Sequence, residues 1–187
     1  RKQLQELLEL QPAHAPPLLA ALAATDRRPG AYSSKLNYHL EPGERADAAT
    51  RTILLGLLDT LEANIDGTRR NLDIEFLHDL RVATRRTRSA LTQVKRVLPE
   101  PVVEEFKQRF AWLGQITGPT RDLDVFLLEL PHYRASLPAS MAGDLDALEG
   151  RLRKAHATEQ GRLKRKLASP EMRALLADWP PREAGRT

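Results

Sequence analysis

The sequence predicts an all-α protein, an antiparallel helical bundle built from long amphipathic helices. Three observations support this prediction. Apolar residues recur at three- and four-residue spacing through most of residues 44–168. No stretch alternates apolar and polar residues with an enrichment in β-branched side chains, so no strand is expected. The Pro and Gly residues fall mainly between the periodic segments, where they would end helices.

The chain divides into three parts. Residues 1–43 are predicted to be a Pro-rich lead-in that holds only short helices, because Pro interrupts the backbone hydrogen bonds of a helix. Residues 44–168 form the helical domain, and residues 169–187 an irregular tail with little pattern. In the domain, the first helix runs from Glu44 to about Ile65 and ends at Gly67.

The second helix opens after Asn71, taken as the N-cap, with Asp73 in the first turn, and stops before Pro99. A third runs over residues 102–116 and is broken at Gly118 and Pro119. A short helix over 122–130 and a long one over 140–168 follow. The expected core includes Phe76, Leu80, Leu91, Val94, Phe106 and Phe110.

Composition narrows the class of protein. A chain of 187 residues suits one domain with a core, or a piece of a larger one. It contains no cysteine, which excludes disulfides and thiolate metal sites. Its apolar runs are far shorter than the roughly 20 residues needed to cross a bilayer, and its N-terminus lacks a signal-peptide pattern. We therefore expect a soluble, cytoplasmic protein without a membrane partner.

Positive charge is concentrated in two segments. Residues 78–98 contain six Lys or Arg and one acid, and residues 151–166 contain seven and one acid. Such clustering is typical of a surface that binds an anion, because like charges repel one another without a compensating partner. The alternative is a pair of well-solvated helix faces laced with intrahelical salt bridges. Because Asp79 is the only acid between Leu77 and Pro99, that helix cannot neutralise its own arginines.

The first cluster forms a stripe on one helix face. At about 100° per residue, its members fall within about 100° of one another, opposite the apolar face. They are His78, Arg81, Arg85, Arg88, Lys95 and Arg96. Arginine suits phosphate, because its planar fork of donors matches two phosphate oxygens at once. A stripe that rises about 5.4 Å per turn would contact successive phosphates of a polymer.

The second cluster repeats the pattern. Four of its members lie within about 80° of one another on the helix over 140–168, namely Arg151, Lys154, Arg162 and Arg165. We expect the two basic stripes to face each other and form a trough.

Four other polar residues leave alternatives open. Asp122 and Asp124 read as first-turn acids that complement a helix dipole, and Asp122 could instead orient an arginine while Arg121 points at a ligand. His156 and Glu159 have a spacing compatible with a metal but lack companions, so no metal site is expected.

Two motifs resemble those of the CHAD family, the conserved-histidine α-helical domains. One is the segment Phe76–Leu91, FLHDLRVATRRTRSAL, and the other is Arg121–Val125, RDLDV, which follows Trp112-Leu113-Gly114. The similarity spans about residues 33–167. It implies an all-α, two-bundle domain that binds inorganic polyphosphate through basic residues, with His78, Arg81, Arg85, Arg88 and Arg121 at matching positions. The family's second basic helix has no counterpart here, which suggests one half, a truncated form, or self-association that completes the bundle.

We therefore expect non-catalytic binding of inorganic polyphosphate, with no cofactor and an association with polyphosphate granules. The lead-in resembles the connection after a triphosphate-hydrolysing CYTH domain, whose alternating acidic and basic strands are absent. A phosphohydrolase would need more carboxylates to hold Mg²⁺ than Asp122 and Asp124. A nucleic-acid-binding module would need exposed aromatic residues for base stacking, which the core spacing of the aromatics disfavours. Docking of an acidic protein is a third alternative.

Overall fold

The structure is a computed structural model that describes residues 38–138 and 141–180. Its helices are α3 (Ala46–Arg70), α4 (Ile74–Gln93), α5 (Glu100–Ser136), α6 (Leu145–Leu167) and α7 (Pro170–Asp178), with a short 3₁₀ turn at Ala142–Asp144. The described residues contain no strand, which confirms the all-α prediction. The part of the lead-in before residue 38 lies outside the described residues, and residues 38–45 form no helix.

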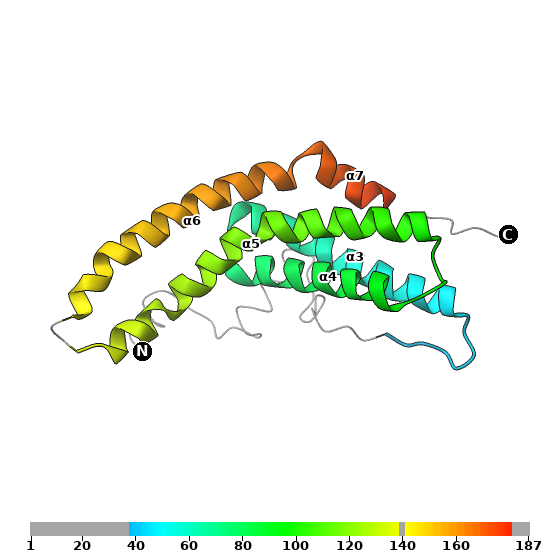
Figure 1. Ribbon diagram of the computed structural model, residues 1–187, viewed down its shortest axis with the longest axis horizontal. Coiled ribbons are helices and arrows are strands. Elements are labelled where there is room, and N and C mark those ends of the chain that lie inside the picture. Colours follow the sequence, from blue (N-terminus) through cyan, green and yellow to red (C-terminus); the bar gives the residue numbers. More distant parts are fainter. Residues whose placement is uncertain (1–37, 139–140, 181–187) are drawn as a thin grey trace, which may run out of the picture. The chain divides into compact units, whose positions relative to one another are not determined.

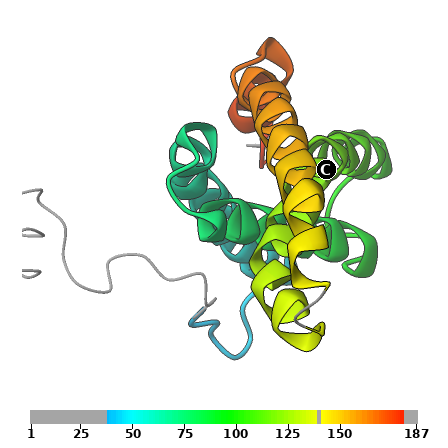
Figure 2. The ribbon, with the colours of Figure 1, turned by 90° about the vertical axis from the view of Figure 1, so that its left-hand side faces the viewer.

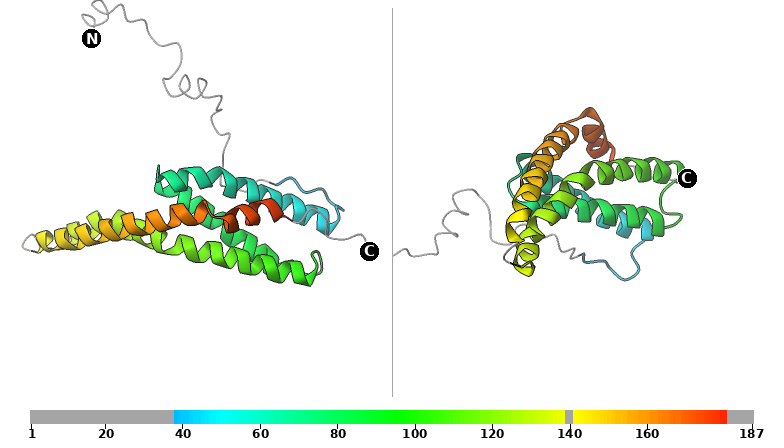
Figure 3. Two further views of the ribbon diagram at one scale, coloured as in Figure 1. Left: turned by 90° about the horizontal axis from the view of Figure 1, so that it is seen from above. Right: turned by 60° about the vertical axis from the view of Figure 1, so that its left-hand side comes forward.

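The four long helices in the described part of the chain form a closed ring of pairwise packing contacts. α3 packs against α4, α4 against α5, α5 against α6, and α6 returns to α3. The end-on view shows α6 seated between α3 and α5 (Figure 2). α5 and α6 extend together beyond the turn that joins α3 to α4 (Figures 1 and 3). This arrangement places α4 and α6 at opposite corners of the bundle, with the core between them.

One cluster of buried apolar side chains extends from α3 to α7. Of the predicted core residues, Leu80, Leu91, Phe106 and Phe110 are buried. Phe76 and Val94 are only partly buried. Phe76 packs instead on Gly67 of α3, where a Cβ would lie only 2.2 Å from the Phe76 ring. Gly67 therefore permits close packing of α4 on α3. The prediction that Gly67 ends the first helix is wrong, because α3 continues to Arg70.

The junction of α3 and α4 differs from the prediction by a few residues. α3 continues to Arg70 and ends at Asn71, which adopts the left-handed conformation (φ 52°, ψ 47°). Asn tolerates this conformation better than most residues, so it serves as a C-cap here. Asp73 is the N-cap of α4, and its side chain accepts a hydrogen bond of 2.8 Å from the Glu75 backbone N–H. The prediction that Asn71 caps α4 is wrong.

α5 is one continuous helix with Pro119 and Pro131 inside it, so the predicted break at residues 118–119 is wrong. Pro119 removes the hydrogen bond to the Gln115 carbonyl. Pro119 and Gln115 are both exposed, so solvent can satisfy this carbonyl at little cost. Packing against α4 and α6 along its length outweighs the local preference for a break.

The predicted irregular tail also contains a helix. Ser169 is the N-cap of α7, and its hydroxyl accepts a hydrogen bond of 3.3 Å from the Met172 backbone N–H. Met172 and Leu175 are buried, and the Trp179 ring lies 4.6 Å from the Phe106 ring. With few residues in α7, its helical period was too short to detect in sequence, but its buried side chains complete the core.

Candidate functional site

Arg81 lies at the boundary between α4 and α5. Its Nη1 donates hydrogen bonds to the Gly114 carbonyl at 3.0 Å and to the Thr117 hydroxyl at 2.9 Å. Burial lowers the pKa of Arg81, and the nearby charge of Asp122 opposes this shift. Guanidinium pKa values are so high that the side chain stays charged. The bonds to α5 fix the guanidinium in place, with the donors on Nε and Nη2 available for another partner.

Two glycines of α5 lie beneath the arginines of α4. An ideal Cβ on Gly118 would be 3.8 Å from the Arg81 Nη1, and one on Gly114 would be 3.7 Å from the Arg88 Nη1. The arginines therefore extend across a part of α5 where no side chains stand between them and the backbone. The sequence predicted that these arginines point away from the apolar core, but Arg81 packs partly between the helices.

Arg121 of α5 and His78 of α4 contact each other across the same boundary. The Arg121 Nη2 lies 3.3 Å from the His78 Nδ1, and its Nη1 lies 3.5 Å from the Ile74 carbonyl. Arginine can only donate, so in this contact the His78 Nδ1 is the acceptor and the ring N–H is on Nε2. His78 therefore has an N–H on the ring edge opposite Arg121 that is available to an anion.

These residues define the α4–α5 basic face, namely His78, Arg81, Arg85, Arg88 and Arg121. Within the described part of the chain, none of its four arginines forms an ion pair with a carboxylate. In contrast, Arg109 pairs with Asp178, and Arg134 pairs with Asp146. The α4–α5 basic face thus retains an excess of positive charge that the predicted salt-bridged alternative would have neutralised.

Two predicted members of the first stripe lie apart from it. α4 ends at Gln93, so Lys95 and Arg96 follow the helix instead of continuing its face. Arg96 adopts a positive φ of 61°, which turns the chain toward α5. The prediction that Lys95 and Arg96 share the stripe with the α4 residues is therefore wrong, because α4 ends before both of them.

The second stripe lies on the outside of α6. Arg151, Lys154, Arg162 and Arg165 are exposed. At 100° per residue they lie about 100–180° from Leu163 and Leu167, which are buried in the core. α6 therefore presents this stripe to solvent and turns its apolar side toward α3 and α5. The prediction that the two stripes face each other across a trough is wrong.

Asp124 and His156 form a buried pair that sequence reasoning missed. The His156 Nε2 lies 2.7 Å from the Asp124 Oδ1, and the two side chains are only 15% and 4% exposed. Burial raises the pKa of Asp124, although His156 and the charge of Arg121 oppose the shift. The interpretation of Asp124 as a first-turn acid that complements a helix dipole is wrong, because α5 is continuous and Asp124 faces α6. If the sequence had been interpreted as one continuous helix from residue 100 onward, Asp124 would have been predicted to lie on an inward face of that helix.

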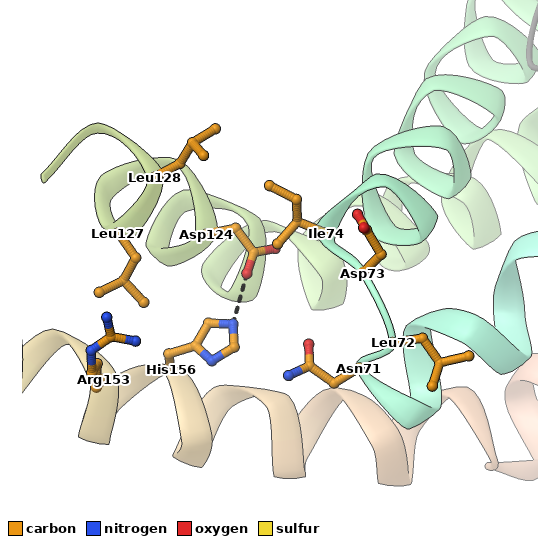
Figure 4. Close-up of a pocket in the computed structure, with 9 residues that line it drawn as sticks. All are labelled: Asn71, Leu72, Asp73, Ile74, Asp124, Leu127, Leu128, Arg153 and His156. Carbon is orange, nitrogen blue, oxygen red and sulfur yellow. Dashed lines mark hydrogen bonds and ion pairs between the residues drawn. The ribbon is translucent and has the colours of Figure 1, made fainter. Parts of the chain in front are cut away.

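A cavity of about 470 Å³ adjoins this pair. Its walls combine apolar side chains such as Leu72 and Leu127 with Asp73, Asp124 and His156 (Figure 4). Glu159, which shares a helix face with His156 in the sequence, pairs instead with Arg162 at 2.6 Å. Among the described residues, no three His, Asp or Glu side chains converge in a way that could hold a metal ion.

Comparisons with known proteins place the chain in a family. The model of the CHAD domain matches residues 52–182, which include α4, α5 and α6 with both sequence motifs. None of the curated proteins compared with the chain matched it. In the described ranges, no helix has the length and apolar character that spanning a membrane requires. Because the family model covers well over half of the sequence, the chain belongs to the CHAD domain family.

Proposed function

We propose that this protein binds inorganic polyphosphate, without hydrolysing it, on the α4–α5 basic face. One observation carries the proposal: four arginines and a histidine from two helices gather on one face, and no carboxylate pairs with the arginines in the described residues. Membership of the CHAD family, whose domains are linked to polyphosphate-related proteins, supports the same ligand.

The arrangement suits a polymer of phosphates better than a single small anion. Arg81 and Arg88 are seven residues apart on α4, a rise of about 10 Å, and Arg121 widens the face across α5. A small dianion would need two or three donors aimed at one point. Here the donors are spread along a helix, and each guanidinium offers a fork that fits the oxygens of a different phosphate.

Nucleic acid is a weaker candidate ligand. Base stacking requires exposed aromatic rings beside the basic residues. Phe106 and Phe110 are buried in the core, and Trp112 packs against it. The exposed aromatic residues Phe126 and Tyr133 lie farther along α5, past Arg121. Phosphate contacts alone would give a polyanion with no bases the same attraction, which favours polyphosphate.

The geometry also disfavours a hydrolase. Phosphoryl transfer needs acids that hold Mg²⁺ beside the substrate and position a water molecule. Asp124 is engaged with His156 on the α6 side of α5. Asp122 is exposed, and its charge lies close to Arg81. We therefore propose a binding role, and we expect incubation with polyphosphate and Mg²⁺ to release no more phosphate than a buffer control.

The double variant Arg85→Glu/Arg88→Glu tests the proposed ligand. Both side chains are exposed and form no described hydrogen bond, so folding should be preserved, whereas Arg81 would confound the result through its bonds to α5. Affinity for polyphosphate should fall by at least 100-fold, because two favourable phosphate contacts become repulsive. Arg45→Glu/Lys107→Glu, which alters two ion-paired surface residues elsewhere, is the charge-matched control.

Competition experiments define the specificity. Labelled polyphosphate bound to the wild-type protein is challenged with unlabelled polyphosphate, DNA, RNA and polyglutamate at equal charge concentration. Only polyphosphate should compete efficiently. Equal loss of affinity in the control variant, or equal competition by DNA or polyglutamate, would show general attraction to polyanions and contradict the proposal.

A further inference from the structure

The outer face of α6 is a second concentration of positive charge that the α4–α5 basic face does not include. We define the α6 outer face as Arg151, Lys154 and Arg165, which are exposed and form no described ion pair. Arg162 lies on the same side but is paired with Glu159. The first and last of these three cations are 14 positions apart in the sequence, a rise of about 21 Å. No acid between residues 151 and 166 other than Glu159 offsets them.

The two basic faces are on different sides of the bundle. His78 and Arg121 lie where α4 meets α5. α6 packs against α5 and α3, with Leu163 and Leu167 turned toward the core, so its outer face points away from α4. A single extended anion that follows the α4–α5 basic face cannot also contact the α6 outer face without bending around α5.

Separate binding faces change what a long polymer can do. A protein with one binding face binds one polyphosphate chain, and several molecules can bind along the same chain. A protein with two faces joins two chains, and each chain contacts many proteins, so the contacts reinforce one another through high effective concentration. The result is a network that grows with chain length.

We propose that the α6 outer face is a second polyphosphate-binding surface, through which one molecule of this protein cross-links two polyphosphate chains. This inference rests on the proposed function, because it assigns the same ligand to a new surface. The small side chains that separate the cations, Ala155, Thr158 and Gly161, leave the helix surface low between them. An extended anion can therefore lie close to all three charges.

The experiment compares short and long polyphosphate. Calorimetry with a short chain, on the order of ten phosphates, should give two binding equivalents per protein. Light scattering with chains of several hundred phosphates should rise sharply. The variant Arg151→Gln/Lys154→Gln/Arg165→Gln should bind one equivalent with an affinity within threefold of the tighter wild-type site, and its scattering should fall at least tenfold. Gln is a good helix former, and circular dichroism checks that α6 persists.

The outcomes separate the two proposals. If the wild-type protein binds no polyphosphate, the proposed function is overturned. One equivalent in the wild-type protein, or unchanged scattering in the α6 variant, would overturn this inference alone and leave the α4–α5 basic face standing. Scattering that falls equally in a variant with Arg45, Arg70 and Lys107 replaced by Gln would also overturn it, because those cations belong to neither face.

Discussion

Arg81 should contribute to both stability and ligand binding, whereas Arg85 should contribute only to binding. In Arg81→Ala, two hydrogen bonds from a charged donor to the Gly114 carbonyl and the Thr117 hydroxyl are lost. Such bonds contribute about 1.5–3 kcal/mol when well buried. Arg81 is only partly buried, and the Thr117 hydroxyl keeps its own bond of 2.7 Å to the Leu113 carbonyl. We therefore expect a loss of about 1–2 kcal/mol.

Chemical denaturation followed by circular dichroism measures this loss. For a domain of this size, the expected change lowers Tm by about 3–6 °C. Arg85→Ala should stay within about 0.5 kcal/mol of the wild-type protein, because its side chain is exposed. Arg81→Lys keeps the charge but lacks the fork that reaches two acceptors, so its stability should fall between the two.

Salt dependence separates charge from hydrogen bonding in the same variants. Four phosphate contacts predict a slope of log K against log salt of about −3, and each Arg→Ala change should reduce its magnitude by about 0.7. Arg81→Lys should retain the wild-type slope.

The stability prediction has an outcome that contradicts it. If Arg81→Ala and Arg85→Ala unfold at the same denaturant concentration, the hydrogen bonds of Arg81 to α5 do not stabilise the packing of α4 on α5, and the geometry of the basic face has been misjudged.

Three further variants test the packing and the buried carboxyl. Gly67→Ala should destabilise the protein by about 1–3 kcal/mol, since the new methyl group collides with the Phe76 ring. Gly150→Ala, in open space on α6, should stabilise it by up to about 1 kcal/mol. Trp179→Ala should cost about 3–5 kcal/mol, because it empties a site between α5 and α7. Burial raises the pKa of Asp124, so the folded state holds this proton to a higher pH than the unfolded chain. The free energy of unfolding of the wild-type protein, measured relative to that of Asp124→Asn, should therefore fall as pH rises above about 4, the usual pKa of Asp. It should level off once the pH exceeds the raised pKa of Asp124.

Each of these predictions has an outcome that contradicts it. Equal denaturation midpoints for the two glycine variants would mean that α4 does not approach α3 closely. A Trp179→Ala protein as stable as the wild type would place residues after 169 outside the core. A stability difference between wild type and Asp124→Asn that grows in favour of the wild type as pH rises would show that pairing with His156 outweighs burial.

Local patterns in the sequence determined the fold class and the nature of the basic face. The helical period from residue 46 to residue 93 was visible because each helix has one face in the core, and the structure confirms helices there. The same period placed His78, Arg81, Arg85 and Arg88 on one side of α4. Because these relations depend only on rise and rotation per residue, neighbouring positions suffice to predict them.

The tertiary structure decided the features that depend on distant residues. Pro119 lies inside a continuous α5 because long-range packing outweighs a local break, and this continuity turned Asp124 toward His156. The α6 cations point to solvent because the opposite face of α6 packs against α3 and α5. Which face of α6 packs there could not be known before the partners of α6 were known. α7 became a helix because its buried side chains, Met172 and Leu175, had a core to enter. A sequence pattern contains the period of each helix but not its partner, so only the packed bundle determines which charges meet and which point apart.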